Sequence, residues 1–522
     1  KKTYVIAGDN ASYASSYNSG TWTGDLIAYP VDLTAGTTDV QNPIWVTGCP
    51  SPNDLVDPSD ATKGKKGCSA QVQLDLRSAS SRKIFTYTGT SGTGEGRQFQ
   101  PTTASTPTKL NATMQNLLNS TVSPPGLTDG AAVLAFLRGD RSGEAATYRL
   151  RTHVMGDIIN AEPLVVREPF FNYGDSGYST FKSNNNLPNP PRARIVIQPA
   201  NDGMVHAFNT ATGVEEWAYV PRLVYANLNN LSKRSGFTHK YAIDGTPVSG
   251  DVDFSNTDGV SGSPSPNWKT IVVGGLGKGG RGYYALDVTT TTAADEAAAK
   301  DKALWEFPNS ATSSADSSNV GFSFGRPIVV KTATRGWVVL GTSGFITGTD
   351  TGGSGGDGNG YLFVLNARTG AVIERIPTNV VKAPAGTATD PSGLAHISAF
   401  VEATDNDNTA TAVYGGDLKG NVWRFDLTGA SNTWNARKLA ALVDGSGVAQ
   451  PITTEPELAK VTTPSGTKRF VYVGTGQYLG DTDVATIQTQ TMYGLIDDLG
   501  SSPLINPLRS NLLEQTLTTN PD

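Results

Sequence analysis

A short hairpin unit that recurs along the chain constrains its fold more than any other feature. The clearest copy is Val413–Leu427, with the sequence VYGGDLKGNVWRFDL. Gly420 lies in a turn-rich segment and can adopt the positive φ that a tight turn requires. After it, Trp423, Phe425 and Leu427 alternate with polar residues, which is the periodicity of a β-strand. The pattern therefore predicts a strand, a tight turn and a second strand.

The same unit appears elsewhere along the chain. Its further copies are Trp22–Gly36, Ile195–Gly213, Ile271–Asp287, Val338–Gly370 and Val471–Asp497. In the better-matched part they recur at intervals of roughly 60–80 residues, with loops of variable length. This interval is longer than a usual blade repeat, but it fits a β-propeller whose blades carry insertions.

Tryptophan residues follow the hairpin at a similar place in several copies. The hairpin ends on an aromatic residue or leucine before Asp or Asn, at Asn209, Asp287, Asn366 and Asp426. Trp217, Trp305 and Trp434 come after the turn that follows. Because such repeated placement is an architectural signature, we interpret these side chains as packing residues between blades and not as a cofactor stack.

The composition favours a turn-rich, all-β protein outside the cytoplasm. Of the 522 residues, only 17% are charged and 58 are glycine. The formal net charge of −6 argues against nucleic acid as a partner, because phosphate binding requires a basic surface. No apolar run is long enough to span a membrane, and the sequence pattern leads us to expect no signal peptide in this stretch. Lys1-Lys2 is not a natural start, so we expect the chain to be a fragment of a longer protein.

The two cysteines, Cys49 and Cys68, flank a segment rich in Pro, Gly and Lys. In an oxidising compartment we expect them to form a disulfide, which would stabilise the fold by about 3 kcal/mol on the chain-entropy model. The alternative is a pair of unrelated buried thiols. The polar, loop-like sequence around both residues favours the disulfide.

One propeller domain is expected over residues 1–500, followed by a polar tail over residues 501–522. Insertions are expected near residues 48–68, 88–150, 168–192 and 289–303. Outside the repeats, Val72–Tyr87 has the pattern of two more strands. Asn111–Ser120 favours a short helix, and Thr128-Asp129 can cap a second helix over Gly130–Leu137.

Six stretches together resemble a known family. They are Met155–Pro163, Asn201–Phe208, Asp244–Val248, Gly274–Asp287, Asp357–Tyr361 and Val413–Leu427. In this order they resemble the C-terminal domain of the PilY/PilC family, large adhesin-like proteins associated with type IV pili. The resemblance covers most of residues 1–500.

The resemblance implies both a fold and a function. The implied fold is a modified, about seven-bladed propeller of the quinoprotein type, with long loop insertions and a few short helices. The implied role is in pilus biogenesis, with pilus extension and retraction, twitching motility and surface attachment. Expected partners are pilin and minor pilin subunits and a host or abiotic surface. The expected location is extracytoplasmic, at the pilus tip, the outer membrane or the cell surface.

The resemblance also implies a calcium loop just before the strand that begins at Val413. The aligned stretch is Ala403–Thr411, ATDNDNTAT. Oxygen ligands at alternate residues of such a loop can surround one hard cation. The candidate calcium ligands are Asp405, Asp407, Thr409 and Thr411.

This loop departs from the family pattern at both ends. Ala403 stands where the first acidic ligand would be, and Thr411 stands where the last would be. One interpretation is a weakened calcium site with an affinity no better than roughly 10⁻⁴ M. The other is a solvated acidic turn, for which DNDN is also a suitable sequence.

Arg138-Gly139-Asp140 is a candidate adhesion motif, because this tripeptide is known for docking to integrins. It follows an apolar helical run, so Gly139 alternatively ends that helix. Matches to three residues are common by chance in long chains, and we favour the structural interpretation.

An enzyme must also be considered, because quinone-dependent dehydrogenases share the expected propeller. The chain has no adjacent cysteines, and its histidines lie one per segment, at His153, His206, His239 and His396. His206 is expected to be a packing residue. The glycine-rich run Gly274–Gly282 lies between two expected strands, which is the wrong context for a phosphate loop. We therefore expect no catalysis and no quinone; a passive envelope scaffold is the third alternative.

Overall fold

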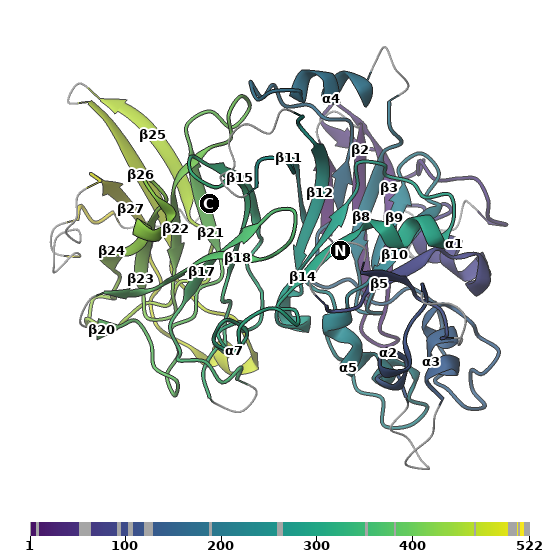
Figure 1. Ribbon diagram of the computed structural model, residues 1–522. Helices are drawn as coiled ribbons and strands as arrows, with labels where there is room; N and C mark the ends of the chain where they lie inside the picture. Colours follow the sequence, from purple (N-terminus) through teal and green to yellow (C-terminus); the bar gives the residue numbers. More distant parts are fainter. Residues whose placement is uncertain are drawn as a thin grey trace.

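The computed structural model is built mainly of antiparallel sheets that follow one another in chain order (Figure 1). It describes residues 2–6, 10–51, 64–90, 95–102, 108–119, 129–186, 191–257, 265–349, 353–380, 383–463, 466–499, 509 and 512–515. The polar tail expected over residues 501–522 lies mostly outside the described residues.

The first three sheets come from the N-terminal half of the chain, and we call them blades 1 to 3. Blade 1 contains β1 (Lys2–Ile6), β2 (Ala11–Asn18), β3 (Thr23–Asp32) and β4 (Thr37–Thr38). Blade 2 contains β7 (Leu164–Val166), β8 (Ile195–Pro199), β9 (Val205–Asn209) and β10 (Glu215–Val220), extended by β5 (Ile84–Tyr87) and β6 (Gly96–Gln98). Blade 3 contains β11 (Val248–Asp253), β12 (Trp268–Gly275), β13 (Tyr283–Asp287) and β14 (Ala303–Phe307).

Blades 4 to 6 complete the series. Blade 4 contains β15 (Ile328–Thr332), β16 (Gly336–Thr342), β17 (Tyr361–Asn366) and β18 (Val372–Pro377). Blade 5 contains β21 (Ile397–Val401), β22 (Ala410–Gly416), β23 (Asn421–Asp426) and β24 (Asn435–Ala441). Blade 6 contains β25 (Glu457–Thr463), β26 (Gly466–Gly474) and β27 (Met492–Asp497). A small ribbon joins β19 (Asn379–Val380) to β20 (Ala383–Pro384).

The arrangement is that of a β-propeller, as expected from the repeats. The first strands of neighbouring blades contact one another: β7 contacts β11, β11 contacts β15 and β21 contacts β25. The described residues form six blades. The clearest predicted hairpin is confirmed as β22 and β23, with Gly420 in the turn at a φ of +76°.

Seven short α-helices of the described residues lie in the segments that connect the strands. They are α1 (Ala70–Leu76), α2 (Ala112–Asn116), α3 (Gly130–Leu137), α4 (Tyr178–Asn184), α5 (Tyr225–Leu228), α6 (Glu296–Ala299) and α7 (Ser314–Ser318). The helix expected over Gly130–Leu137 is confirmed, and the helix expected over Asn111–Ser120 is confirmed over a shorter span. In Figure 1, α2, α3 and α5 lie together below the strands of blade 2.

The expectation of two strands over Val72–Tyr87 is wrong in its first half. Val72, Leu74 and Leu76 alternate with polar residues, but the segment folds as α1. Ala70 and Leu74, one helical turn apart, are buried against blade 1, whereas Leu76 is exposed. Contact with the sheet therefore overrides the local period of two. The second half is confirmed, because Ile84–Tyr87 forms β5.

The core lies between blades rather than within one central cluster. Five apolar clusters join blade 1 to blade 2, 2 to 3, 3 to 4, 4 to 5 and 5 to 6. In β8, Val196 faces blade 1 while Ile195 and Ile197 face blade 3. The middle strands are thus buried on both faces, which explains their nearly continuous apolar sequences.

One tryptophan from each of blades 1, 2 and 3 anchors that blade to the next one. Their indole Nε1 atoms donate to backbone carbonyl oxygens of the following blade: Trp45 to Thr210 at 2.8 Å, Trp217 to Thr291 at 2.6 Å and Trp305 to Ala367 at 3.0 Å. All three rings are almost fully buried. The interpretation of Trp217 and Trp305 as packing residues between blades is confirmed.

Trp434 is buried but does not belong to this set. It packs in the cluster between blades 4 and 5, and its Nε1 has no hydrogen-bond partner among the described residues. In the strand register, Trp217 lies opposite Ala207, whereas the matching place in blade 5 holds Arg437 opposite Arg424. Trp434 is thus confirmed as a packing residue between blades, although it does not occupy the register position of Trp217.

We predict that Gly213→Ala will destabilise the domain through the Trp45 anchor. Gly213 has a φ of +73°, and an added Cβ would lie 2.6 Å from the Trp45 ring. Gly447 is the matched control, because its φ is +82° and its Cβ would meet nothing within 4 Å. In denaturant unfolding, Gly447→Ala should cost about 1–2 kcal/mol from backbone strain alone, and Gly213→Ala about 2 kcal/mol more. Equal losses would show that the contact with Trp45 is not tight.

Candidate functional site

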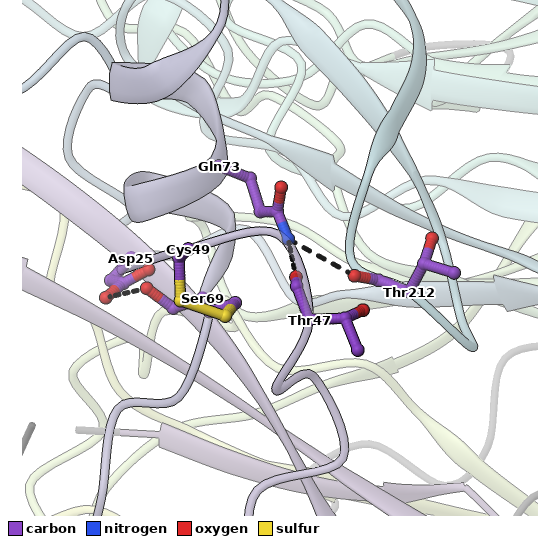
Figure 2. The surroundings of a disulfide bond; sticks show 7 residues. Asp25, Thr47, Cys49, Ser69, Gln73 and Thr212 are labelled. Carbon is purple, nitrogen blue, oxygen red and sulfur yellow. Dashed lines mark hydrogen bonds between the residues drawn. A yellow bond between two sulfur atoms is a disulfide. The ribbon is translucent and has the colours of Figure 1, made fainter. Parts of the chain in front are cut away.

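The disulfide loop lies where blade 1 meets blade 2 (Figure 2). Cys49 and Cys68, which the sequence analysis pairs, are joined with an S–S distance of 2.02 Å. The Gln73 side chain of α1 donates to the carbonyl oxygen of Thr47, at 3.1 Å, and of Thr212 in blade 2, at 3.4 Å. The loop therefore helps to fasten the two blades together.

The candidate adhesion motif is part of the fold. The guanidinium group of Arg138 pairs with Glu296 at 2.7 Å and donates to the carbonyl oxygens of Phe99 and Arg82, both at 2.8 Å. Its side chain is 7% exposed. Because a buried guanidinium group cannot reach a receptor carboxylate, the geometry favours the interpretation that Arg138-Gly139-Asp140 simply ends α3.

We predict that Arg138→Ala will destabilise the domain and that Asp140→Ala will have a small effect. Removing Arg138 leaves the Glu296 carboxylate buried without its partner, which costs about 3–5 kcal/mol. Asp140 accepts a local hydrogen bond from the Ser142 amide at 2.9 Å. The measurements are thermal unfolding and surface attachment. Loss of attachment in Asp140→Ala with unchanged unfolding would instead support an adhesive role.

A buried ionic network lies beside this motif. Arg82 makes two hydrogen bonds to the Glu215 carboxylate, both at 2.8 Å. His206 contacts Glu215 through Nδ1 at 2.8 Å and Asp202 through Nε2 at 3.1 Å. Burial alone would lower the pKa of His206, but the charges and hydrogen bonds of Asp202 and Glu215 raise it to about 9. His206 is thus an ionic member of the core, which its place in a strand did not reveal.

This network predicts a pH dependence that can be assigned to His206. Its pKa is higher in the folded protein than the usual 6.5, so its contribution to stability is complete below about pH 6.5 and is lost as the pH rises to about 9. At about 1.4 kcal/mol per pKa unit, the contribution is on the order of 3 kcal/mol. The destabilisation caused by His206→Gln should therefore shrink across this range in denaturant unfolding. A destabilisation that is constant with pH would contradict a charged His206.

A narrow cleft lies next to the network, between blade 1 and the loops that precede blade 3. Trp22, Asp157, Asn201 and His239 are among its lining residues. His239 contacts the Asp157 carboxylate at 2.9 Å and stacks on Trp22 with ring centroids 3.8 Å apart. Asn201 donates to the same carboxylate at 2.8 Å. His239, Asn201 and Asp157 thus bind one another, and in the described part of the chain no three His, Cys, Asp or Glu side chains are placed to hold a metal ion.

The candidate calcium loop connects β21 to β22. The amides of Asn406 and Asp407 donate to the Ala403 carbonyl oxygen, at 3.1 and 2.9 Å, and form a compact turn. The Thr409 hydroxyl donates to the Asp407 carboxylate at 2.9 Å. The Thr411 hydroxyl accepts from Arg469 at 3.1 Å.

These residues do not fit a calcium ion. Calcium takes six to eight oxygen ligands at about 2.3–2.6 Å. Here the Asp407 carboxylate is paired with the ammonium group of Lys331 at 2.8 Å. The carbonyl oxygens of Asp405 and Asn406 accept backbone hydrogen bonds from the 168–192 insertion. Lys331 is distant from the loop in sequence and belongs to no recognisable motif. Its contact with Asp407 is therefore visible only in the structure.

Blade 6 exposes an unusual number of apolar side chains. Tyr478, Val484, Ile487, Met492 and Leu499 are 71%, 72%, 99%, 76% and 54% exposed. They belong to the loop between β26 and β27, the first residue of β27 and the segment just after it. Such a concentration of exposed apolar residues is typical of an interaction surface. None of the described helices is both long and apolar enough to cross a membrane.

The fold and these sites define a β-propeller. Ionisable side chains such as Arg138, His206 and His239 pair with carboxylate groups within the fold. The chain belongs to the family described as the PilY1 beta-propeller domain, whose model matches residues 155–522. The resemblance inferred from the six sequence stretches is thereby confirmed.

Relatives match the chain beyond that range. The type IV pilus biogenesis factor PilY1 of Pseudomonas aeruginosa (strain UCBPP-PA14) is 30% identical over 556 residues, covering 97% of this chain and 41% of the relative. A PilY1 homolog of Xylella fastidiosa (strain Temecula1) is 28% identical over 499 residues, covering 93% of this chain and 32% of that protein. The chain thus spans less than half the length of these relatives.

One solved structure is similar over a smaller part of the chain. The crystal structure of the Pseudomonas aeruginosa PilY1 C-terminal domain is 27% identical, covers 65% of each chain and has a TM-score of 0.48.

Proposed function

We propose that this domain acts in type IV pilus biogenesis, where it supports pilus extension and retraction, twitching motility and attachment to surfaces. The observation that carries the proposal is the 30% identity, over 97% of the chain, to a protein named as a type IV pilus biogenesis factor. Because the chain covers 41% of that relative, the domain acts as one part of a larger protein located at the pilus or cell surface.

Within this function the domain is a binding module and not an enzyme. The ionisable groups described above pair with one another: His239 with Asp157, His206 with Glu215 and Arg138 with Glu296. Both cysteines of the chain are consumed in one disulfide. These pairings support a structural use of the groups that a quinone-dependent dehydrogenase would need for cofactor binding and proton transfer.

The contact surface for pilin and minor pilin subunits is proposed to include the exposed apolar residues of blade 6. Exposed aromatic and aliphatic side chains supply the binding energy of many protein interfaces. Ile487 and Met492, at 99% and 76% exposure, are the most exposed of these five side chains. Attachment to a host or abiotic surface would use other exposed loops of the same protein.

The proposal predicts the phenotype of Ile487→Ser/Met492→Ser in the full-length protein. In a bacterial strain that lacks the gene, the wild-type protein should restore pili and twitching. The variant should restore them only weakly, although it folds normally. Leu33→Ser in blade 1 is the matched control, because Leu33 is 64% exposed and directly follows β3, which lies on the opposite side of the molecule from blade 6 (Figure 1). Surface pili are counted by microscopy and twitching by zone diameter.

Two outcomes would contradict parts of this proposal. Normal pili and twitching in the deletion strain would overturn the pilus function itself. Wild-type behaviour of the Ile487/Met492 variant would remove blade 6 as the contact surface.

Addition of a quinone and calcium tests the dehydrogenase alternative. A stoichiometric absorbance change together with alcohol oxidation would support that alternative.

A further inference from the structure

Three segments that are far apart in sequence meet at the side chain of Lys331. Lys331 belongs to β15 of blade 4, Asp175 to the insertion at residues 168–192, and Asp407 to the loop that precedes β22 of blade 5. The Lys331 Nζ lies 2.8 and 2.9 Å from the two carboxylate oxygens of Asp175 and 2.8 Å from Oδ1 of Asp407. These are distances of charge-assisted hydrogen bonds.

The backbone holds the same three segments in register. The Lys331 amide donates to the Asn408 carbonyl oxygen at 2.9 Å. On the other side of the loop, the amides of Asn172 and Gly174 donate to the carbonyl oxygens of Asp405 and Asn406, at 2.8 and 2.9 Å. Main-chain hydrogen bonds therefore fix the segments around the ammonium group, which is held in one place and is not a freely moving surface charge.

The surroundings of Lys331 favour a localised positive charge. Its side chain is only 13% exposed, and Nζ lies 5.8 Å from the centre of the Trp337 ring. Burial would raise the pKa of Asp407, but hydrogen bonds from Lys331 and Thr409 and the charge of Lys331 hold it below its usual value. An ammonium group has three donors, and three carboxylate oxygens lie within reach of it.

We propose that Lys331 is the cation of this loop, an ammonium group built into the chain in the place that a calcium ion would have in the family pattern. It neutralises Asp175 and Asp407, and it fastens the 168–192 insertion to blades 4 and 5. Because this cation is covalently part of the domain, the loop keeps its conformation without calcium. With Ala403 and Thr411 at its ends, the loop carries few carboxylates, which suits a single positive charge better than a divalent ion.

The first test uses the wild-type protein. Its melting temperature should be the same in excess chelator and in millimolar calcium, and calorimetric titration with calcium should give no saturable heat. A calcium-dependent rise of several degrees that disappears in Asp407→Asn would overturn the proposal.

The second test removes the ammonium group. Lys331→Met should lower the melting temperature by about 3 °C or more and should increase amide exchange at residues 170–175 and 403–409. Lys331→Arg, which keeps the charge, should retain most of the protection. Unchanged exchange in both segments of Lys331→Met would show that the ion pairs do not hold them, and would equally overturn the proposal.

Lys460→Met is the matched control. Lys460 pairs with Glu402 near the same loop, but both side chains are about half exposed, at 50% and 46%. Exposed pairs contribute little to stability, so this variant should leave exchange at 170–175 unchanged. If Lys331→Met does not fold, the wild-type calcium measurements and Lys331→Arg still decide the question.

Discussion

The packing of neighbouring blades against one another is the interaction on which the rest of the structure depends. In β8, successive residues face opposite blades: Val196 packs toward blade 1 and Ile197 toward blade 3. A middle strand in such a stack has no solvent face, so its sequence must be apolar at consecutive positions. Each of blades 2 to 5 therefore depends on both neighbours, because neither of its faces can be exposed to water at low cost.

Ion pairs add to this apolar stacking where the long insertions attach to the blades. Both insertions also bury apolar side chains there, as Phe136 does in the cluster of blades 2 and 3 and Tyr178 in the cluster of blades 3 and 4. In addition, Arg138 joins the 88–150 insertion to Glu296, and Lys331 joins the 168–192 insertion to blade 5. Arg82 ties the segment before β5 to Glu215 of blade 2. Because burying an unpaired charge is costly, each pair also fixes the position of the segment that carries its partner.

Local patterns allowed the hairpins, the helix over Gly130–Leu137 and the interblade role of Trp217 and Trp305 to be predicted from the sequence. The information needed for these features lies within a few residues. The helix at Ala70–Leu76 was missed because its alternating pattern has a local period of two, and only the contact with blade 1 decides otherwise. The contacts of Lys331 were not foreseen because Asp175 and Asp407 come from distant segments of the chain. The partners of His206, Asp202 and Glu215, are close in sequence, but only the folded hairpin shows that all three side chains meet.

The exchange of a metal ion for a lysine changes how a loop can respond to its surroundings. A bound metal stabilises the folded state by an amount that depends on its concentration, and the loop then reports that concentration. An ammonium group of the chain has a fixed effective concentration, and its contacts with Asp175 and Asp407 persist wherever the protein is folded. A propeller held in this way gives up regulation by calcium and gains a constant geometry between blades 4 and 5. The contacts that the proposed pilus function requires would then be set by which surfaces the blades expose, and not by the ions around them.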